Sequence, residues 1–180
     1  KEAQNLALIK KELLQKGIKI PLVADIHFNP KAAEIAATIV EKVRINPGNY
    51  IDRKRGKIDY SEKEYQFELE KIADRLYPLI SICKENGTAI RIGTNHGSIS
   101  ERILAKYGNT AVGMVASAME FVQICREFNF HDLVLSMKAS NVSIMKTANI
   151  LLVETMIKAG FYYPLHLGVT EAGNGDDGRI

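Results

Sequence analysis

Residues 89–98 have the sequence AIRIGTNHGS, in which a short apolar run gives way to charged and amide side chains. Such a run is typical of a buried strand in a parallel sheet, and the polar residues stand where the strand ends. The same pattern occurs four more times along the chain. The sequence therefore predicts five strands, at residues 20–27, 43–46, 89–93, 133–138 and 164–169.

Helical patterns fill the intervals between the predicted strands. The clearest is an apolar stripe from Leu69 to Cys83 with spacings of three and four, preceded by a capping box of Ser61 and Glu64 and followed by Gly87. Two further stripes occupy residues 115–122 and 145–159. Because the crossover between parallel strands needs a helix, this alternation predicts the α/β class.

The polar residues at the strand ends distinguish a barrel from an open sheet. In a doubly wound sheet, ligands gather at one switch point, whereas a barrel collects residues from many strand ends around one mouth. All five predicted strands end in polar groups. We therefore predict a partial TIM (β/α) barrel of about five parallel strands, with residues 1–180 as a single domain.

The predicted mouth is rich in groups that bind anions. Strand side chains alternate between two faces, so residues two apart, such as Arg44 and Asn46, share a face. Arginine pairs bidentately with phosphate and lysine supplies a movable charge, which favours a phosphate or diphosphate ester as ligand. The candidate residues are Asp25, His27, Arg44, Asn46, Arg91, Asn95, His96, Lys138, Ser140, Asn141, His166, Thr170 and Glu171.

The rest of the sequence argues against several other classes of protein. The formal net charge is only +3, and the short basic cluster at residues 53–57 suits a solvated loop better than a nucleic-acid surface. No stretch approaches the roughly 18 to 20 apolar residues of a membrane span, so we expect a cytoplasmic protein. Cys83 and Cys125 stand singly, which predicts buried thiols and no metal site.

The strand endings resemble, in order, the motifs of the 4-hydroxy-3-methylbut-2-enyl diphosphate synthase family. The matching segments are residues 21–28, 43–49, 90–93 with 95–98, 138–141 and 164–173, and the match continues at residues 178–180. The resemblance covers nearly the whole chain. Residues 50–60 and the DGRI ending further resemble the larger, three-domain type of the family.

This resemblance implies a reaction and a cofactor. The family's TIM barrel binds 2-C-methyl-D-erythritol 2,4-cyclodiphosphate, and the enzyme, an oxidoreductase, opens it reductively in the methylerythritol phosphate pathway of isoprenoid biosynthesis. Electrons come from ferredoxin or flavodoxin through a [4Fe-4S] cluster. Cysteines of a separate carboxyl-terminal domain, absent from this sequence, hold that cluster in the family.

The resemblance also assigns roles to individual residues. It implies that Arg44, Asn46, Arg91, Asn95 and Lys138 hold the diphosphate and orient the ring. It makes Glu171 the acid near the reacting hydroxyl, which is coherent because water leaves readily only when protonated.

The family's barrel has strands before and after the part that this sequence resembles. Five strands would leave the sheet edges open. We therefore expect an inactive piece of the barrel that associates as a homo-oligomer.

Two other functions are compatible with the same mouth. Lys138 near a strand end suits a Schiff-base lysine, as in a phosphosugar aldolase or lyase. Alternatively, the mouth holds an anion without chemistry, as a phosphate-binding module. Taken singly, each charge would be an ordinary surface ion pair, and His27, His96 and His166 suit a neutral core or rim histidine as well as a ligand.

Overall fold

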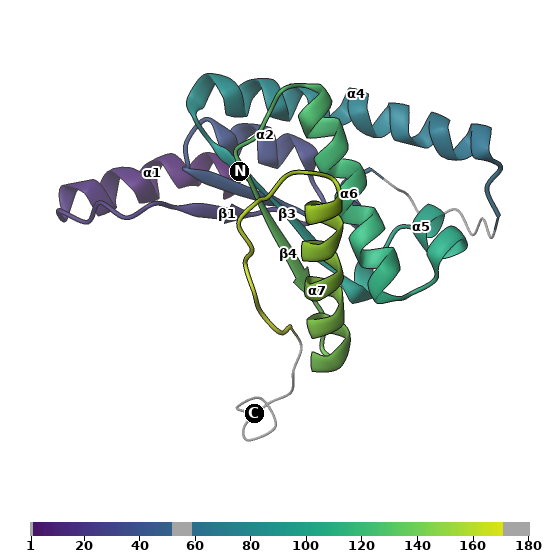
Figure 1. Ribbon diagram of the computed structural model, residues 1–180. Coiled ribbons are helices and arrows are strands. Elements are labelled where there is room, and N and C mark those ends of the chain that lie inside the picture. Colours follow the sequence, from purple (N-terminus) through teal and green to yellow (C-terminus); the bar gives the residue numbers. More distant parts are fainter. Residues whose placement is uncertain (1, 52–58, 171–180) are drawn as a thin grey trace.

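The computed structural model of the chain describes residues 2–51 and 59–170. Its centre is a sheet of four parallel strands in the order β1-β2-β3-β4, so each strand pairs with the one that follows it in the sequence (Figure 1). The strands are β1 (Val23–Asp25), β2 (Lys42–Ile45), β3 (Ala89–Asn95) and β4 (Leu133–Lys138). This sequential order is that of a partial barrel.

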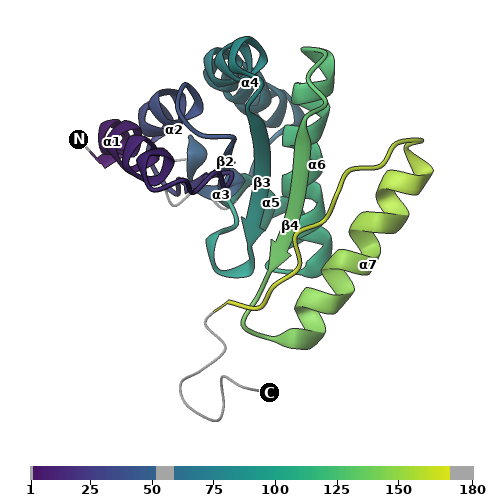
Figure 2. The same cartoon turned by 90° about the vertical axis from the view of Figure 1, so that its left-hand side faces the viewer.

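Helices connect the strands and cover the sheet. In Figure 2, α6 lies behind β3 and β4, with α2 and α4 toward one side of the sheet and α7 toward the other. The elements are α1 (Glu2–Gln15), α2 (Pro30–Ala37), α3 (Pro47–Tyr50), α4 (Glu62–Asn86), η1 (His96–Ser98), α5 (Glu101–Tyr107), α6 (Ala111–Glu127) and α7 (Val142–Lys158). No helix within the described ranges is long and apolar enough to cross a bilayer.

The two faces of the sheet differ in polarity because side chains alternate along each strand. The register aligns Ala24, Val43, Ile90 and Leu133 in one row, and these residues belong to the buried core shared with the helices. The next row, on the opposite face, begins with the charged residues of the candidate site. The helices therefore pack against the apolar face, and the charged residues of the candidate site lie on the other face.

The helix signals of the sequence are confirmed. The Ser61 side chain accepts a hydrogen bond from the Glu64 amide, and the Glu64 carboxylate accepts one from the Ser61 amide. The helix α4 begins directly after Ser61, at Glu62. Gly87 adopts the left-handed conformation that ends α4. The two later stripes correspond to α6 and α7.

Four of the five predicted strands are confirmed, residues 133–138 with the predicted bounds and the other three with shifted bounds, and the fifth is wrong. Residues 164–169 form only an isolated bridge, in which the Leu135 amide donates to Pro164 O (2.9 Å) and the His166 amide donates to Leu135 O (2.8 Å). One pair of hydrogen bonds does not fix a strand. Within the described residues no strand lies on the outer side of this segment to hold it in register.

Candidate anion-binding site

A row of charged residues crosses the polar face of the sheet. Asp25 of β1, Arg44 of β2 and Arg91 of β3 are aligned partners in the parallel register. Arg44 Nη1 donates to Asp25 Oδ1 at 2.8 Å, and Arg91 Nη2 lies 3.6 Å from Asp25 Oδ2. One carboxylate thus lies between two guanidinium groups.

Arg44 is held across three strands. Its Nη1 also donates to the His27 imidazole, and its Nη2 donates to Gly93 O (2.9 Å) and to Asn95 Oδ1 (3.2 Å). An arginine can only donate, so the accepting His27 nitrogen carries no proton. Arg44 is 3% exposed, whereas the Asp25 side chain is 53% exposed. The guanidinium is therefore a fixed charge just beneath the surface.

Each of the three cations keeps a donor that no described residue uses, which for Arg44 is its buried Nε. Arg91, 7% exposed, donates from Nη1 to His166 Nδ1 at 3.2 Å, but its buried Nε has no partner among the described residues. Lys138 ends β4 and extends beside Gly168. Its ammonium makes no hydrogen bond or ion pair within residues 2–51 and 59–170. Donors that face no acceptor suit an incoming anion.

The carboxylate of the row is stabilised in its charged form. Burial alone would raise the pKa of Asp25, but the Arg44 guanidinium outweighs this by charge and hydrogen bond, and His27 and Arg91 contribute. The pKa of Asp25 is therefore lowered below its ordinary value, so the carboxylate is ionised at neutral pH.

The bases of the cluster are destabilised in their charged forms. Burial lowers the pKa of His27, His166, Lys138 and Arg91, and nearby positive charges lower it further. For Lys138 these charges are Arg91 and Arg44. The cluster brings three basic side chains, Arg44, Arg91 and Lys138, together with one described carboxylate, that of Asp25, so positive charge is in excess at this site.

These shifts predict the titration of two histidines. We expect His27 and His166 to titrate below their ordinary pKa of 6.5, because burial and nearby cations oppose the imidazolium. In an NMR titration, added pyrophosphate should raise both pKa values, and Lys138→Met should raise them slightly. Lys63→Met, on the exposed start of α4, is the control. Titration of either imidazole at or above 6.5 in the free protein would contradict this assignment.

Other predicted site residues lie outside this cluster. Asn46 is fully buried, its Oδ1 accepts from the Gly48 amide (3.1 Å), and its Nδ2 donates to Ser98 Oγ (2.8 Å). Asn141 caps α7 by accepting from the Ile144 amide. The remaining positions give no contact with the cluster: His96 Nε2 lies 3.1 Å from Asn109 O, Ser140 is exposed, and the Thr170 amide donates to Ala139 O. Binding roles for these residues stay predictions.

Several sequence features fall outside the described residues. They are Glu171, the basic cluster at residues 53–57, most of the segment at residues 50–60 and the DGRI ending. The catalytic role of Glu171 therefore also stays a prediction.

Sequence reasoning missed the tie between two strand-end loops. Ser98 accepts from Asn46, and the backbones approach so closely that a Cβ on Gly48 would lie 1.5 Å from Ser98 O. The only available signal was the glycine that follows Pro47. This tie fixes α3 against η1, at the end of the sheet that carries the cluster.

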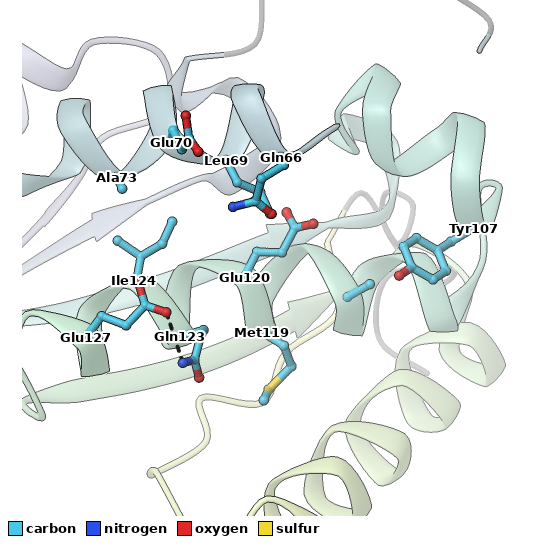
Figure 3. Close-up of a pocket in the computed structure, with 11 residues that line it drawn as sticks. Gln66, Leu69, Glu70, Ala73, Tyr107, Met119, Glu120, Gln123, Ile124 and Glu127 are labelled. Carbon is cyan, nitrogen blue, oxygen red and sulfur yellow. Dashed lines mark hydrogen bonds between the residues drawn. The ribbon is translucent and has the colours of Figure 1, made fainter. Parts of the chain in front are cut away.

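Described cavities lie beside or away from the cluster. Figure 3 shows a groove of about 570 Å³ between α4 and α6, on the helical side, with Glu70, Glu120 and Glu127 among its lining residues. A polyanion would be repelled there. A smaller cavity of about 340 Å³ lies at the strand ends between Phe28 and Asn109.

The described residues do not fit an iron–sulfur cluster. Cys83 and Cys125 are free and buried in the core under α4 and α6, as the sequence predicts. Burial raises the pKa of each thiol to about 12, whereas cluster ligation needs thiolates. Within the described ranges, no three His, Cys, Asp or Glu side chains gather as a metal site.

Comparisons with known proteins agree with the fold. The chain is 58% identical over 182 residues to 4-hydroxy-3-methylbut-2-en-1-yl diphosphate synthase (flavodoxin) of Parabacteroides distasonis, covering 100% of this chain and 30% of that protein. The Bacteroides thetaiotaomicron protein of the same name is 56% identical, with the same coverage. The chloroplastic, ferredoxin form of Oryza sativa subsp. japonica is 53% identical, covering 100% of this chain and 24% of that protein.

The chain thus spans under a third of the length of these relatives. A sequence model described as the GcpE TIM-barrel domain matches residues 1–180. The predicted α/β partial barrel is confirmed, and the chain belongs to the GcpE TIM-barrel domain family.

Proposed function

We propose that this chain is the substrate-binding barrel part of an enzyme that reductively opens 2-C-methyl-D-erythritol 2,4-cyclodiphosphate to 4-hydroxy-3-methylbut-2-enyl diphosphate. The observation that carries the proposal is the cationic cluster of Arg44, Arg91 and Lys138, which lie on β2, within β3 and at the carboxyl end of β4. The names of the relatives give the product and the redox partner, and the family resemblance supplies the cyclic substrate. The cluster supplies the chemistry that a diphosphate requires.

The residues of this chain would bind and orient the substrate. Arg91 and Lys138 would hold the diphosphate oxygens, because both keep donors that no described residue uses. Arg44 would add a fixed positive charge behind them, oriented by Asp25, and Asn95 would donate an amide hydrogen bond. The positive charges of these side chains would stabilise the diphosphate as its charge redistributes during ring opening.

Glu171 would supply the proton that lets the reacting hydroxyl leave as water. The electrons would come from flavodoxin or ferredoxin, the donors that the relatives' names give. A [4Fe-4S] cluster would be held by residues outside this chain, since the described residues do not fit one. Self-association and a cytoplasmic location stay predictions from the sequence.

The experiment that tests this function is anaerobic turnover of the full-length protein with reduced flavodoxin or ferredoxin and the cyclic diphosphate. We expect the linear diphosphate as product. Arg91→Ala should raise the Kd for the cyclic diphosphate by about 10- to 100-fold, the range expected when one charge-assisted contact is lost. No turnover by a protein that carries its cofactor and accepts electrons would reject the proposal.

A second function has one observation in its favour. Burial and neighbouring cations lower the pKa of Lys138, which is the condition that Schiff-base lysines need. The chain would then belong to a phosphosugar aldolase or lyase. Borohydride trapping of a substrate adduct on Lys138 would favour this function, and absence of trapping together with turnover of the cyclic diphosphate would exclude it.

A further inference from the structure

We propose that Gly93 is a positioning residue: because glycine has no Cβ, the Arg44 side chain can lie in the space above the Cα of Gly93. This inference deepens the proposed function and rests on it, because it names what fixes the most buried cation of the anion site. Gly93 touches neither substrate nor reacting atoms in this proposal. It acts through Arg44.

The geometry shows how completely Arg44 fills this space. A Cβ added to Gly93 would lie 2.3 Å from Arg44 Nε, 3.1 Å from its Cγ and 3.2 Å from its Cδ. Contacts below about 3.0 Å do not occur for real Cβ atoms, so the arginine would have to move. Nε clashes outright and Cγ and Cδ are in tight contact, so rotation of the tip of the arginine alone would not relieve the crowding.

Moving the arginine would break most of its hydrogen bonds. Arg44 Nη2 donates to the carbonyl of Gly93 itself, so the glycine supplies both the space and one acceptor. Nη1 reaches Asp25 and His27 on the far side of β2. A guanidinium lifted from the sheet would lose this fork of contacts on both sides, and Arg44 is only 3% exposed.

Gly168 has the same relation to Lys138 in a weaker form. A Cβ there would lie 3.3 Å from Lys138 Cε and 3.7 Å from its Nζ. A lysine tip can shift by a few tenths of an ångström at little cost, whereas the confined arginine cannot. The structure therefore predicts a rank order, with a large effect at residue 93 and a small one at residue 168.

The test is a double-mutant cycle in the full-length protein with inorganic pyrophosphate as the probe. Gly93→Ala should weaken pyrophosphate binding about tenfold or more and lower Tm, as overpacking of a filled space does. Gly168→Ala should weaken binding by about threefold or less. Gly97→Ala is the matched control, because a Cβ there meets nothing within 4 Å, and its Kd should be unchanged. In an Arg44→Ala background the space is empty, and Gly93→Ala should have no further effect on Kd or Tm.

Each alternative outcome decides the question. Wild-type affinity in Gly93→Ala, or an equal loss of affinity in both backgrounds, would overturn the proposal. If Gly93→Ala fails to fold, folding of the double variant with the Tm of Arg44→Ala would support it, and failure of the double variant would overturn it. If the wild type binds no pyrophosphate, the proposed function fails. The Tm cycle then still decides whether Gly93 seats Arg44.

Discussion

In the full-length protein, Glu171→Gln should lower kcat for the cyclic diphosphate by about 10²- to 10⁴-fold, the range that loss of a general acid gives, and leave the substrate Kd within about threefold. The reason is the leaving group. A hydroxyl group leaves as water only if a proton arrives during bond cleavage. Glutamine keeps the size and polarity of the side chain but has no proton to give.

The measurement is anaerobic turnover and substrate binding on the same preparations. Glu127→Gln, an exposed residue at the end of α6 and away from the carboxyl ends of the strands, is the control and should keep the wild-type kcat. A Glu171→Gln protein with unchanged kcat and a raised Kd would show that Glu171 binds substrate rather than protonates it. The assignment of Glu171 as the acid would then be wrong.

Lys138→Met should have opposite effects on binding and stability. Loss of the ammonium should weaken pyrophosphate binding by about 10- to 100-fold, since a hydrogen bond to a charged group contributes about 1.5–3 kcal/mol. The same change should raise Tm, because Lys138 lies among like charges and makes no compensating ion pair with a described residue. Methionine keeps the length of the side chain and its apolar packing.

The pH dependence of stability provides a second test of the role of Lys138. A lowered pKa means that the unfolded chain binds the Lys138 proton more tightly than the folded protein does. The free energy of unfolding should therefore rise with pH, up to the ordinary pKa of 10.5, and Lys138→Met should flatten that rise. Lys63→Met is the control for both measurements. A variant that loses stability without losing affinity would show that Lys138 is structural.

The elements of the fold could be read from local pattern, with one informative failure. The bounds of β4 and the start and end of α4 follow from residues within the element itself, such as the capping box of Ser61 and Glu64. Residues 164–169 have an equally good apolar pattern but form only a bridge to Leu135. A strand needs hydrogen-bonded neighbours, and periodicity says nothing about whether they are present.

The candidate site, like the fold, could be predicted from the sequence only in part. The alternation of side chains places Arg44 and Arg91 on one face, and the parallel register then aligns them. Asn46 obeys the same alternation, yet its side chain turns to the Gly48 amide and Ser98. Neighbouring hydrogen-bonding groups determine such choices, and one of them, Ser98 Oγ, comes from a loop 52 residues away in sequence.

The sequence by itself thus determined the α/β alternation and the polar face, because these follow from the period of the strand, and it predicted an anionic ligand from the charge of the side chains. Only the tertiary structure decided which charged side chains pair with other groups of the protein and which do not. Arg44 is committed to Asp25, His27 and Gly93, while Lys138 stays unpaired within the described residues. The physical reason is that pairing depends on distances between strands that are brought together by folding, and a single missing Cβ at Gly93 is enough to direct a guanidinium.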